Sequence, residues 1–358
     1  MSKIIEKLKY NIEDFGKTQI FLPDATRGAV RFVTTEQLKS TQTKGVVINT
    51  LHLLINIGPE KIMELGGMHR FMNWDGYILS DSGGFQVFSL LHSKKWQGKV
   101  DKDGATFRAP IDGTVHRLTP ESSIDIQIAL DSDVLVVLDD CRSADVTRSD
   151  AELSVDRTLQ WAYRAKNHFE KKYGGFAKTK KLISAVVQGG SYDDLRIKCA
   201  QELVKIGFDG YNFGGFVVDE KGELVKDQLN VVAENTPADR FKYAMGIGKP
   251  EDILEAYRLG YNVFDTVLVT RNARHGTLYS FDKEDENYAL RIKNSRYNKD
   301  LSPIDSTCDC DACKNYSRAY FHNMLKSNEA SAVSLMSVHN LRFYQRWIEK
   351  ISEMEMKA

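Results

Sequence analysis

The sequence predicts an α/β protein folded as a TIM (β/α)8 barrel. Two observations lead to this fold class. Short apolar runs alternate with helical patterns along most of the chain, and five of the runs end in carboxylate, amide or glycine residues. Strands that alternate with helices are typical of βα units in a parallel sheet. In a barrel of such units the carboxyl ends of all strands meet on one face, so we expect these polar residues to lie together.

Seven strands can be placed from the apolar runs. Their segments are, in chain order, GVVINT (45–50), YILSDSGGFQVFSL (77–90), DVLVVLDDC (133–141), LISAVVQGG (182–190), DGYNFGGFVVDE (209–220), YAMGIG (243–248) and NVFDTVLVT (262–270). An eighth strand is assigned to TLYSF (277–281), and the clearest helical patterns lie at 191–207 and 250–260. With 358 residues, against about 250 for a typical barrel, the chain has room for insertions within a single catalytic domain over 1–358.

The composition is that of an ordinary globular chain, with 42% apolar residues, 27% charged residues and a formal net charge of zero. No apolar stretch approaches the roughly 18 residues of a membrane helix, and residues 1–19 mix charged with apolar residues instead of forming a signal-peptide core. We therefore expect a cytoplasmic protein without a membrane partner. Because no global field attracts nucleic acid, any RNA affinity has to come from a local basic patch.

Asp265 is the first candidate catalytic residue. It ends an apolar run and precedes Arg271 and Arg274, so a strand would deliver a carboxylate next to a loop that can hold a polyanion. Beside two arginines the carboxylate stays ionised and can act as a nucleophile on a phosphate-bearing substrate. A single aspartate at a strand end usually caps a turn. A second carboxylate, Asp81, ends another run before a pair of glycines, and this repetition favours catalysis.

Three further runs end in residues suited to ligand binding. They end at Asp139, at Gln188, and at Gly215 with Glu220 beyond it. Paired glycines let the backbone pass close to a ligand and leave N–H groups open that a larger side chain would cover. We expect these residues to share the face that carries the two catalytic carboxylates.

Cys308, Cys310 and Cys313 form a Cys-x-Cys-x2-Cys pattern in a chain with five cysteines. In a cytoplasmic protein, three thiols this close together are poor disulfide partners and good zinc ligands. Either His322 or His339 would supply the fourth ligand of a Cys3His site. A tetrahedral site with four protein ligands is closed, so we expect a structural zinc ion rather than a catalytic one.

A set of motifs runs from the first predicted strand to the last helix: DSGGFQVFSL, VVQGGSYDDLR, GGFVVDE, FDTVLVTRNARHGTLYS, CDCDACKNYSRAY and HNLRFY. In this order they resemble the tRNA-guanine transglycosylases of bacterial type, in the queuine tRNA-ribosyltransferase family. The resemblance implies a TIM barrel, a zinc subdomain inserted at 283–345, and a homodimer. It also implies exchange of guanine at the wobble position of tRNAs with a G-U-N anticodon for a 7-deazaguanine, in queuosine biosynthesis or salvage. No nucleotide cofactor is expected, since phosphate-loop and dinucleotide fingerprints are absent from the sequence.

The resemblance also assigns roles to the candidate residues. Asp265 resembles the nucleophile and Asp81 the general acid/base. The remaining assignments are base recognition by Asp139, Gln188 and the backbone of Gly215, packing on the base by Phe85, zinc binding by Cys308, Cys310, Cys313 and His339, and contact with the anticodon loop by Arg271 and Arg274. The family pattern thus favours His339 over His322 as the fourth ligand.

The chain departs from the family pattern in the loop next to the base. The usual Gly-Gly-Leu-Ala-Val-Gly-Glu reads GGFVVDE, so Phe216, Val217 and Asp219 differ while Val218 and Glu220 match. We expect the substituent of the incoming base to lie against this loop. Asp219 either pairs with a cationic aminomethyl arm or faces solvent without a role. The expected base is 7-aminomethyl-7-deazaguanine, with queuine as the alternative, which Val218 disfavours by filling space that its cyclopentenediol needs.

Three other functions remain in view. A metal-dependent barrel hydrolase needs an open zinc site with a water ligand, which clustered cysteines do not provide. A catalytically silent RNA-binding paralogue would not need both Asp81 and Asp265. Insertion of a deazaguanine into DNA is the closest enzymatic alternative.

Overall fold

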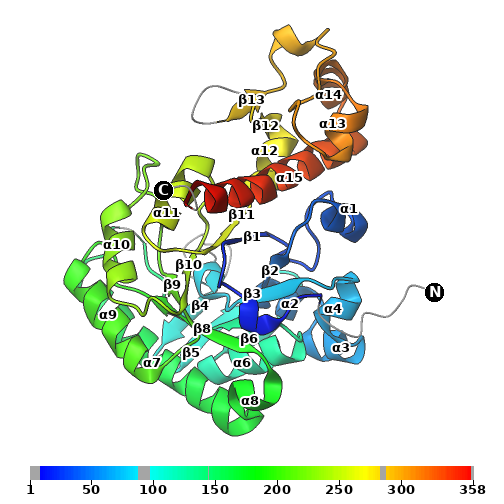
Figure 1. The fold of residues 1–358 in the computed structure, drawn as a ribbon. Coiled ribbons are helices and arrows are strands. Elements are labelled where there is room, and N and C mark those ends of the chain that lie inside the picture. The colour runs from blue at the N-terminus through cyan, green and yellow to red at the C-terminus, as the bar shows by residue number, and fades with distance from the viewer. Residues whose placement is uncertain (1–8, 88–96, 144, 283–287, 356–358) are drawn as a thin grey trace.

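The computed structural model describes residues 9–87, 97–143, 145–282 and 288–355. Its central element is an eight-stranded parallel sheet that forms the predicted barrel, with helices on the outside (Figure 1). The strands follow the order β1, β11, β10, β9, β8, β7, β3 and β2. Their bounds are Ile20–Pro23 (β1), Gly45–Asn49 (β2), Tyr77–Asp81 (β3), Val134–Val136 (β7), Leu182–Val187 (β8), Gly210–Phe213 (β9), Phe241–Ala244 (β10) and Val263–Thr266 (β11).

Strands β1 and β2 close the barrel at its mouth. A parallel bridge joins Asp24 to Val47, and the N–H of Ala25 donates to the carbonyl of Val47 at 2.7 Å. On its other side, β1 pairs with β11 along its whole length. The N-terminal strand therefore connects the last strand of the barrel to the second.

The eighth barrel strand is β1, and the assignment of TLYSF (277–281) to the barrel is wrong. In the structure β12 (Thr277–Tyr279) pairs antiparallel with β13 (Ala289–Arg291) in a separate two-stranded sheet. Strand β1 carries little signal in the sequence because its apolar run is four residues long and ends in proline. The other seven predicted strands are present, although 88–90, at the end of one predicted segment, lie outside the described residues.

Helices cover the outer face of the barrel. The two clearest predicted helices are present as α9 (Asp193–Ile206) and α11 (Pro250–Arg258). Leu195, Cys199 and Leu203 form the buried side of α9, as their spacing predicts. The other helices that flank or connect the barrel strands are η1 (Ile12–Asp14), α1 (Thr35–Ser40), α2 (Thr50–Asn56), α3 (Pro59–Glu64), α4 (Gly67–Met72), α6 (Pro120–Ala129), α7 (Arg148–Tyr173), α8 (Gly175–Thr179), α10 (Lys226–Glu234) and α12 (Leu268–His275).

A small antiparallel sheet is inserted between β3 and α6. It consists of β4 (Gly98–Asp101), β5 (Gly104–Arg108) and β6 (Val115–Leu118), and it was not predicted from the sequence. Trp161 on α7 donates its indole N–H to the carbonyl of Lys102 at 2.8 Å, which ties the sheet to the barrel. Thr119 and Ser122 then form a capping box that starts α6.

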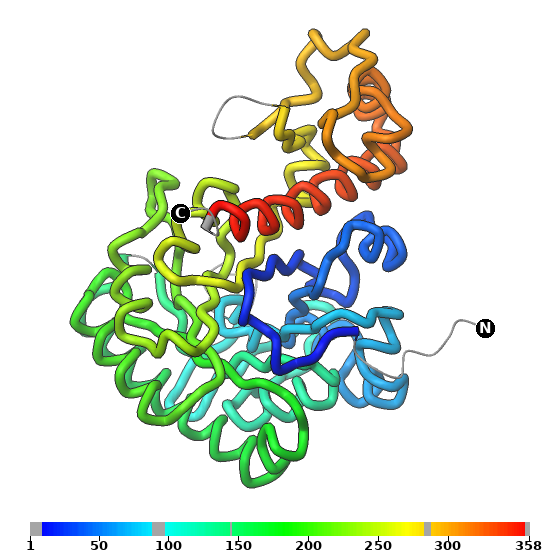
Figure 2. The backbone as a smooth tube through the Cα atoms, in the orientation of Figure 1, coloured from blue at the N-terminus to red at the C-terminus, as the bar shows by residue number. Residues whose placement is uncertain are grey.

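The C-terminal subdomain is joined to the barrel by one long helix. Beyond β12 and β13 it contains η2 (Ser295–Tyr297), α13 (Asp311–Asn315), α14 (Arg318–Lys326) and α15 (Ala330–Glu355). The first part of α15 buries Met336 in the cluster of the subdomain, and the later part buries Tyr344 and Trp347 in the core of the barrel. In the backbone tube, α15 therefore lies next to the N-terminal strand β1 (Figure 2). Residues 283–287, at the start of the predicted subdomain, lie outside the described residues.

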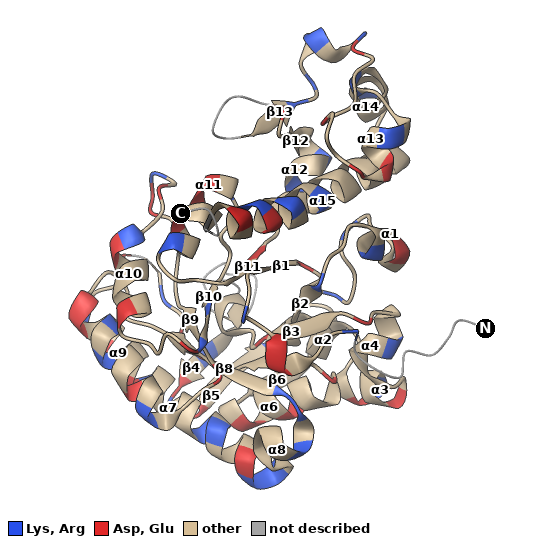
Figure 3. Cartoon of the chain, in the orientation of Figure 1, with Lys and Arg blue, Asp and Glu red and all other residues tan. Residues whose placement is uncertain are grey.

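Charged side chains of both signs are interspersed over the outer helices, for example on α7 and α9 (Figure 3). This distribution agrees with the formal net charge of zero. Among the described helices, none combines the length and the apolar character needed to cross a lipid bilayer.

Candidate active site and metal cluster

Alternation along the strands brings the predicted catalytic side chains to one mouth of the barrel. Residues i and i+2 of a strand point to the same side of a sheet. Leu79 on β3 and Val263 on β11 belong to the buried cluster inside the barrel. Asp81 and Asp265 lie two positions later, at the carboxyl ends of the same strands, and Gln188 follows β8. The barrel interior is apolar and its mouth is polar for this reason.

Asp265 ends β11 and is held by two donors. Its Oδ1 accepts a hydrogen bond from the Tyr243 hydroxyl at 2.7 Å and one from the Gly246 N–H at 2.8 Å. Burial raises the pKa of Asp265 to about 6. The two hydrogen bonds oppose this rise, and the neighbouring carboxylates Asp24 and Asp81 add to it. Oδ2 has no hydrogen-bond partner among the described residues, so it is the oxygen open to a ligand.

Asp81 occupies the corresponding position on β3. Asn49, its register partner on β2, donates Nδ2 to Asp81 Oδ2 at 2.8 Å. Burial raises the pKa of Asp81, and hydrogen bonds from the Gly83 N–H and the Gln86 side chain offset only part of the rise. A carboxyl group with a raised pKa keeps its proton to a higher pH than an exposed aspartate does, which favours a role as general acid/base.

Asp139 and Gln188 form a hydrogen-bonded pair across the barrel from Asp265. Gln188 Nε2 donates to Asp139 Oδ2 at 2.6 Å, and both side chains are buried. Burial raises the pKa of Asp139 to about 7. The Gln188 bond opposes the rise, whereas the charges of Asp81 and Asp140 add to it. When ionised, this carboxylate can accept two N–H bonds from one edge of a ligand.

Two glycines let the backbone approach this pair. A Cβ on Gly84 would lie 2.3 Å from Asp139 Oδ1, and a Cβ on Gly214 would lie 2.7 Å from Gln188 Nε2. Both distances are shorter than a Cβ tolerates, so the polar side chains would have to move. The glycine pairs after β3 and β9 are thus needed to pack the polar pair.

The carboxylates share one cavity of about 380 Å³. Its acidic lining residues are Asp24, Asp81, Asp139 and Asp265, and among the residues that the structure describes no lysine, arginine or histidine lines it. Phe85 and Phe216 also line it, are 42% and 39% exposed, and meet edge to face with their ring centroids 5.8 Å apart. Exposed aromatic rings of this kind offer faces on which a nucleobase can stack.

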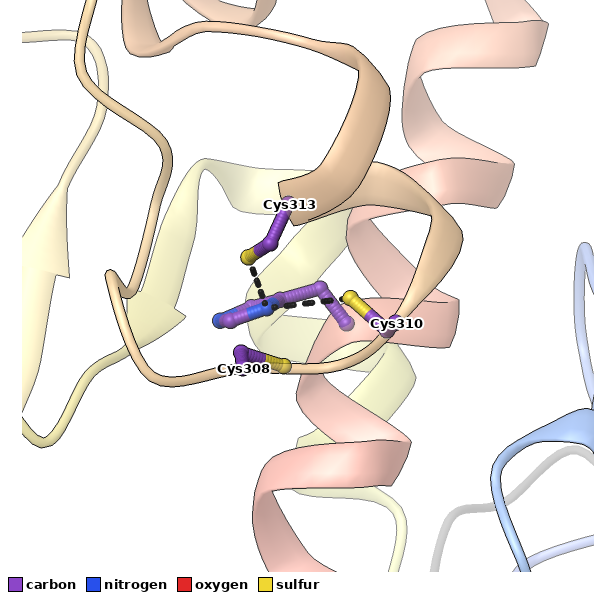
Figure 4. Close-up of side chains that lie close together, drawn as sticks. Cys308, Cys310 and Cys313 are labelled. Atoms are coloured by element: carbon purple, nitrogen blue, oxygen red, sulfur yellow. Dashed lines mark hydrogen bonds between the residues drawn. The ribbon is translucent and has the colours of Figure 1, made fainter.

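A second cluster lies in the C-terminal subdomain. One ligand atom from each of Cys308, Cys310, Cys313 and His339 lies within 4.8 Å of all the others. Nδ1 of His339 is 3.2 Å from the sulfur of Cys313 and 3.6 Å from that of Cys310 (Figure 4). Nε2 donates to the carbonyl of Tyr279 at 2.6 Å, which leaves the lone pair of Nδ1 facing the thiols. The four residues can hold a metal ion, and the donor set is typical of zinc.

His322 is not part of this cluster. It is buried on α14, and its Nδ1 donates to the carbonyl of Ile292 at 2.8 Å. Its Nε2 has no partner in the described part of the chain. Of the two histidines that the spacing of the cysteines left open, His339 is therefore the one that faces the thiols.

Known proteins are similar to this sequence over almost its whole length. A family model described as Queuine tRNA-ribosyltransferase matches residues 9–354. A queuine tRNA-ribosyltransferase of Psychrobacter sp. (strain PRwf-1) is 41% identical over 337 residues, which cover 94% of this chain and 86% of the relative. Those of Acinetobacter baylyi and Acinetobacter baumannii (strain ACICU) are also 41% identical, over 94% and 93% of this chain and 84% and 85% of the relatives. The chain belongs to the queuine tRNA-ribosyltransferase family.

In this member of the queuine tRNA-ribosyltransferase family, the altered loop after β9 is a tight hairpin. An antiparallel bridge joins Val218 to Leu224. Oδ1 of Asp219 accepts hydrogen bonds from the N–H groups of Lys221 and Glu223, both at 2.9 Å. The Asp219 carboxylate is thus engaged in the turn, and Asp219 is not among the residues that line the 380 Å³ cavity. A direct pair between Asp219 and the arm of a bound base does not fit this geometry.

Two other residues of this loop were predicted to bind substrate. Phe216 lines the 380 Å³ cavity. Glu220 is exposed and lines a neighbouring cavity of about 1000 Å³, which contains none of the four acidic residues named above. Gly215 lines both cavities, with its backbone in the left-handed region at a φ of 96°. The role of Glu220 stays a prediction.

The two arginines expected to contact RNA lie on α12. Arg271 is exposed and Arg274 is partly buried, with Nη1 3.2 Å from the Thr270 hydroxyl. Burial lowers the pKa of Arg274, and the charges of Arg31 and Arg271 lower it further. Arg31 and Arg271 are therefore near enough to Arg274 for their charges to act on it. On a molecule without net charge, the three arginines form a local positive patch of the kind that binds a phosphate backbone.

One acidic residue of the cavity, Asp24, was not predicted. It follows β1, and its Oδ1 accepts hydrogen bonds from the N–H of Thr26 at 3.2 Å and from the Thr26 hydroxyl. Burial raises the pKa of Asp24, while the Thr26 bonds and the charge of Arg274 oppose the rise. The signal was the alternation in IFLPD, where Ile20 and Leu22 point into the barrel and Asp24 continues the same side.

Proposed function

We propose that this protein exchanges guanine at the wobble position of tRNAs with a G-U-N anticodon for a 7-deazaguanine, in queuosine biosynthesis or salvage. One observation carries the proposal: Asp265 and Asp81 line the same cavity as Asp139, which pairs with Gln188. The cavity therefore offers two carboxylates for chemistry and, for recognition of a base, the Asp139 carboxylate, which Gln188 holds in place. Membership of the queuine tRNA-ribosyltransferase family supports tRNA as the substrate class.

Asp265 is the proposed nucleophile. Because Tyr243 and Gly246 hold Oδ1, Oδ2 is free to attack C1′ of the target nucleotide. The C1′–N9 bond breaks and its electron pair leaves with guanine, while an ester forms between the carboxylate and the ribose. The incoming base then displaces the carboxylate from the opposite face, so the configuration at C1′ is retained. The ester conserves the free energy of the broken glycosidic bond, so ATP is not required.

Asp81 is the proposed general acid/base. It lines the same cavity, and its raised pKa suits donation of a proton to the departing guanine. The resulting carboxylate can then take the proton from N9 of the incoming base. Assistance of this kind contributes roughly 10²–10⁴-fold to the rate.

Guanine recognition follows from its donors and acceptors. Asp139 accepts from the ring N1–H and the exocyclic amine. Gln188 already donates one hydrogen of Nε2 to Asp139, so its second hydrogen and the Gly215 N–H are available to O6. Phe85 packs on the plane of the base. Adenine presents the reverse pattern at these positions and would leave the Asp139 carboxylate without a donor.

We infer that 7-aminomethyl-7-deazaguanine is the incoming base. Its 7-substituent projects beside O6, and so toward the segment that follows Gly215. Four acidic residues and no basic one line the cavity in the described part of the chain, so a cationic arm gains more there than a neutral one. Val217 and Val218 also line this end and restrict its size. Queuine, with its bulky cyclopentenediol, is the second candidate.

The remaining parts of the proposal rest on the family resemblance. Arg271 and Arg274 contact the anticodon loop. The Cys3His cluster holds one structural zinc ion within a subdomain that spans 283–345. The enzyme acts as a homodimer in the cytoplasm.

A guanine-exchange assay tests the function. We expect radiolabelled guanine to enter a tRNA with a G-U-N anticodon without ATP, and Asp265→Ala to lower kcat/KM by roughly 10³-fold or more. Asp156→Asn is the matched control, because it removes an exposed carboxylate of α7 whose ion pair among the described residues is with Lys198 at 2.8 Å. Full exchange by Asp265→Ala would reject the nucleophile. RNA binding without exchange would favour the silent paralogue, and faster exchange into a DNA loop would favour the DNA reaction.

Competition among bases tests the choice of substrate. Guanine labelled at the wobble position should be released fastest by 7-aminomethyl-7-deazaguanine, more slowly by the neutral 7-cyano analogue, and slowest by queuine. Val218→Gly should speed up release by queuine, because it removes the side chain that limits the size of the cavity. If queuine wins with the unaltered protein, the inferred base is wrong and the mechanism stands.

A further inference from the structure

Asp24 is a carboxylate of the cavity that neither the proposed chemistry nor guanine recognition uses. We propose that Asp24 accepts a hydrogen bond from the 2′-hydroxyl of the target nucleotide and thereby makes the enzyme select RNA over DNA. The inference rests on the proposed exchange reaction and adds a specificity-determining residue to it.

The position of Asp24 on β1 places it beside the nucleophile. Leu22 is the register partner of Asp265, and Asp24 lies two residues beyond Leu22 on the same side of the strand. Neighbouring strands are about 4.8 Å apart, and two residues advance a strand by roughly 6–7 Å. Asp24 therefore stands next to Asp265 and one step nearer the mouth. Both residues line the cavity.

The base and the ribose have to occupy different halves of this cavity. Asp139 follows β7 and Gly215 follows β9, so the base lies over that side of the barrel. C1′ has to reach Asp265 on β11, and the next strand in the order is β1. A nucleotide anchored in this way directs its sugar toward Asp24. The 2′-hydroxyl is attached to the carbon next to C1′, so it lies in the same half of the cavity.

The hydrogen bonds of Asp24 leave one oxygen for this contact. The N–H and the hydroxyl of Thr26 both donate to Oδ1 and fix the carboxylate. Among the described residues, no hydrogen bond reaches Oδ2 and no ion pair holds Asp24, although Arg274 and His52 act on it through space. A carboxyl oxygen without a partner can accept a hydrogen bond from a hydroxyl group. Within a polynucleotide the 2′-hydroxyl is the donor that the sugar offers, and DNA lacks it.

A cycle of protein and RNA changes tests this pairing. The substrates are anticodon stem-loops with all-ribose sugars or with a single 2′-deoxy sugar at the target, at the preceding or at the following nucleotide. Guanine exchange is measured as kcat/KM for the unaltered protein, Asp24→Val and Asp24→Asn. The unaltered protein should lose about 10- to 100-fold with the 2′-deoxy target, the value of a hydrogen bond to a charged group. For Asp24→Val, kcat/KM on all-ribose RNA should fall by a similar factor. The 2′-deoxy target should lower the kcat/KM of this variant little further.

The asparagine variant keeps an acceptor oxygen of the same size, so it should retain part of the 2′-deoxy penalty even if the valine variant folds poorly. Thermal melting and metal content show whether each variant is folded. If the penalty stays complete in Asp24→Val, or if a flanking sugar rather than the target carries it, the pairing is wrong. A substrate that is exchanged equally well with and without the target 2′-hydroxyl also rejects it, whereas failure to exchange all-ribose RNA rejects the proposed function itself.

Discussion

At the scale of single residues, the site depends on carboxylates whose burial works against their ionised form. Burial raises the pKa of Asp265 to about 6 and that of Asp139 to about 7. The proposed nucleophile and the proposed base acceptor both act as carboxylates. Protonation of Asp265 therefore removes the lone pair that attacks C1′, and protonation of Asp139 removes the acceptor that recognises guanine.

A rise of activity with pH is expected from these two groups. Below about pH 5 both carboxyl groups are largely protonated, and above about pH 8 both are largely ionised. The kcat/KM of guanine exchange should therefore climb from about pH 5 towards pH 8, and it should fall again at the pH where Asp81 loses the proton that it donates to guanine. Initial rates at subsaturating guanine, with RNA integrity checked at each pH, provide the measurement. A profile that is flat or falls over this interval would contradict the assignment of both groups.

Most of the candidate site could be predicted from the sequence because each strand ends where an apolar run changes to polar or glycine residues. Asp81, Asp139 and Asp265 each follow a run of apolar residues, and the parallel barrel brings such ends together. The geometry of Asp219 was not visible in this way. Its carboxylate bonds two backbone N–H groups within four residues of itself, and a local turn of this kind gives no long-range signal.

At the scale of secondary-structure elements, the parallel strands differ in how much sequence signal they carry. Gly45–Asn49 and Leu182–Val187 are buried runs of five and six residues, and both were predicted. Strand β1 has four residues and depends on pairing with β11 and β2, which are distant in sequence. Its tertiary partners, rather than its own composition, make it a strand. The same strand delivers Asp24, so the missed element and the missed residue have one cause.

The hairpin after β9 is the element that presents Phe216 to the cavity. Asp219→Gly should loosen it, because the two hydrogen bonds that Oδ1 accepts are lost and glycine adds backbone freedom. We expect KM for the incoming base to rise about 3- to 10-fold, as for the loss of about 1 kcal/mol, with kcat nearly unchanged. Steady-state exchange at varied base concentration measures both constants.

Asp219→Asn is the matched control for the hairpin. Its side-chain oxygen can accept the same two hydrogen bonds without the negative charge. If Asn restores the KM of the unaltered protein, the turn is what matters. A different result would contradict the role of the turn: Asp219→Asn and Asp219→Gly weaken binding of 7-aminomethyl-7-deazaguanine equally and leave binding of guanine unaffected. The negative charge of Asp219 would then act on the arm of the base.

At the scale of the whole molecule, α15 connects two clusters of buried side chains. Met336 and the cysteines of the metal cluster belong to the buried side chains of the subdomain, Trp347 belongs to the barrel, and His339 lies between Met336 and Trp347 along the helix. The adjacent Asn340 donates Nδ2 to the carbonyl of Val269 at 3.1 Å, on the helix that carries the arginines expected to contact RNA. The metal cluster is thus placed to position α12, the helix proposed to contact RNA, while the carboxylates of the mouth depend on the barrel.

Loss of the metal should therefore weaken RNA binding more than chemistry. Cys310→Ala should remove about one zinc ion per chain, lower the melting temperature, and raise KM for tRNA while kcat at saturating tRNA falls much less. His339→Ala should behave alike, because its Nδ1 faces the thiols. His322→Asn should keep the metal, since an amide can still donate to the carbonyl of Ile292. Metal analysis and exchange kinetics on the same samples decide the outcome. If His322→Asn loses the metal while His339→Ala retains it, the assignment of His339 as the fourth ligand is wrong. If loss of the metal lowers kcat strongly while KM for tRNA is unchanged, the ion acts on the chemistry and not through α12.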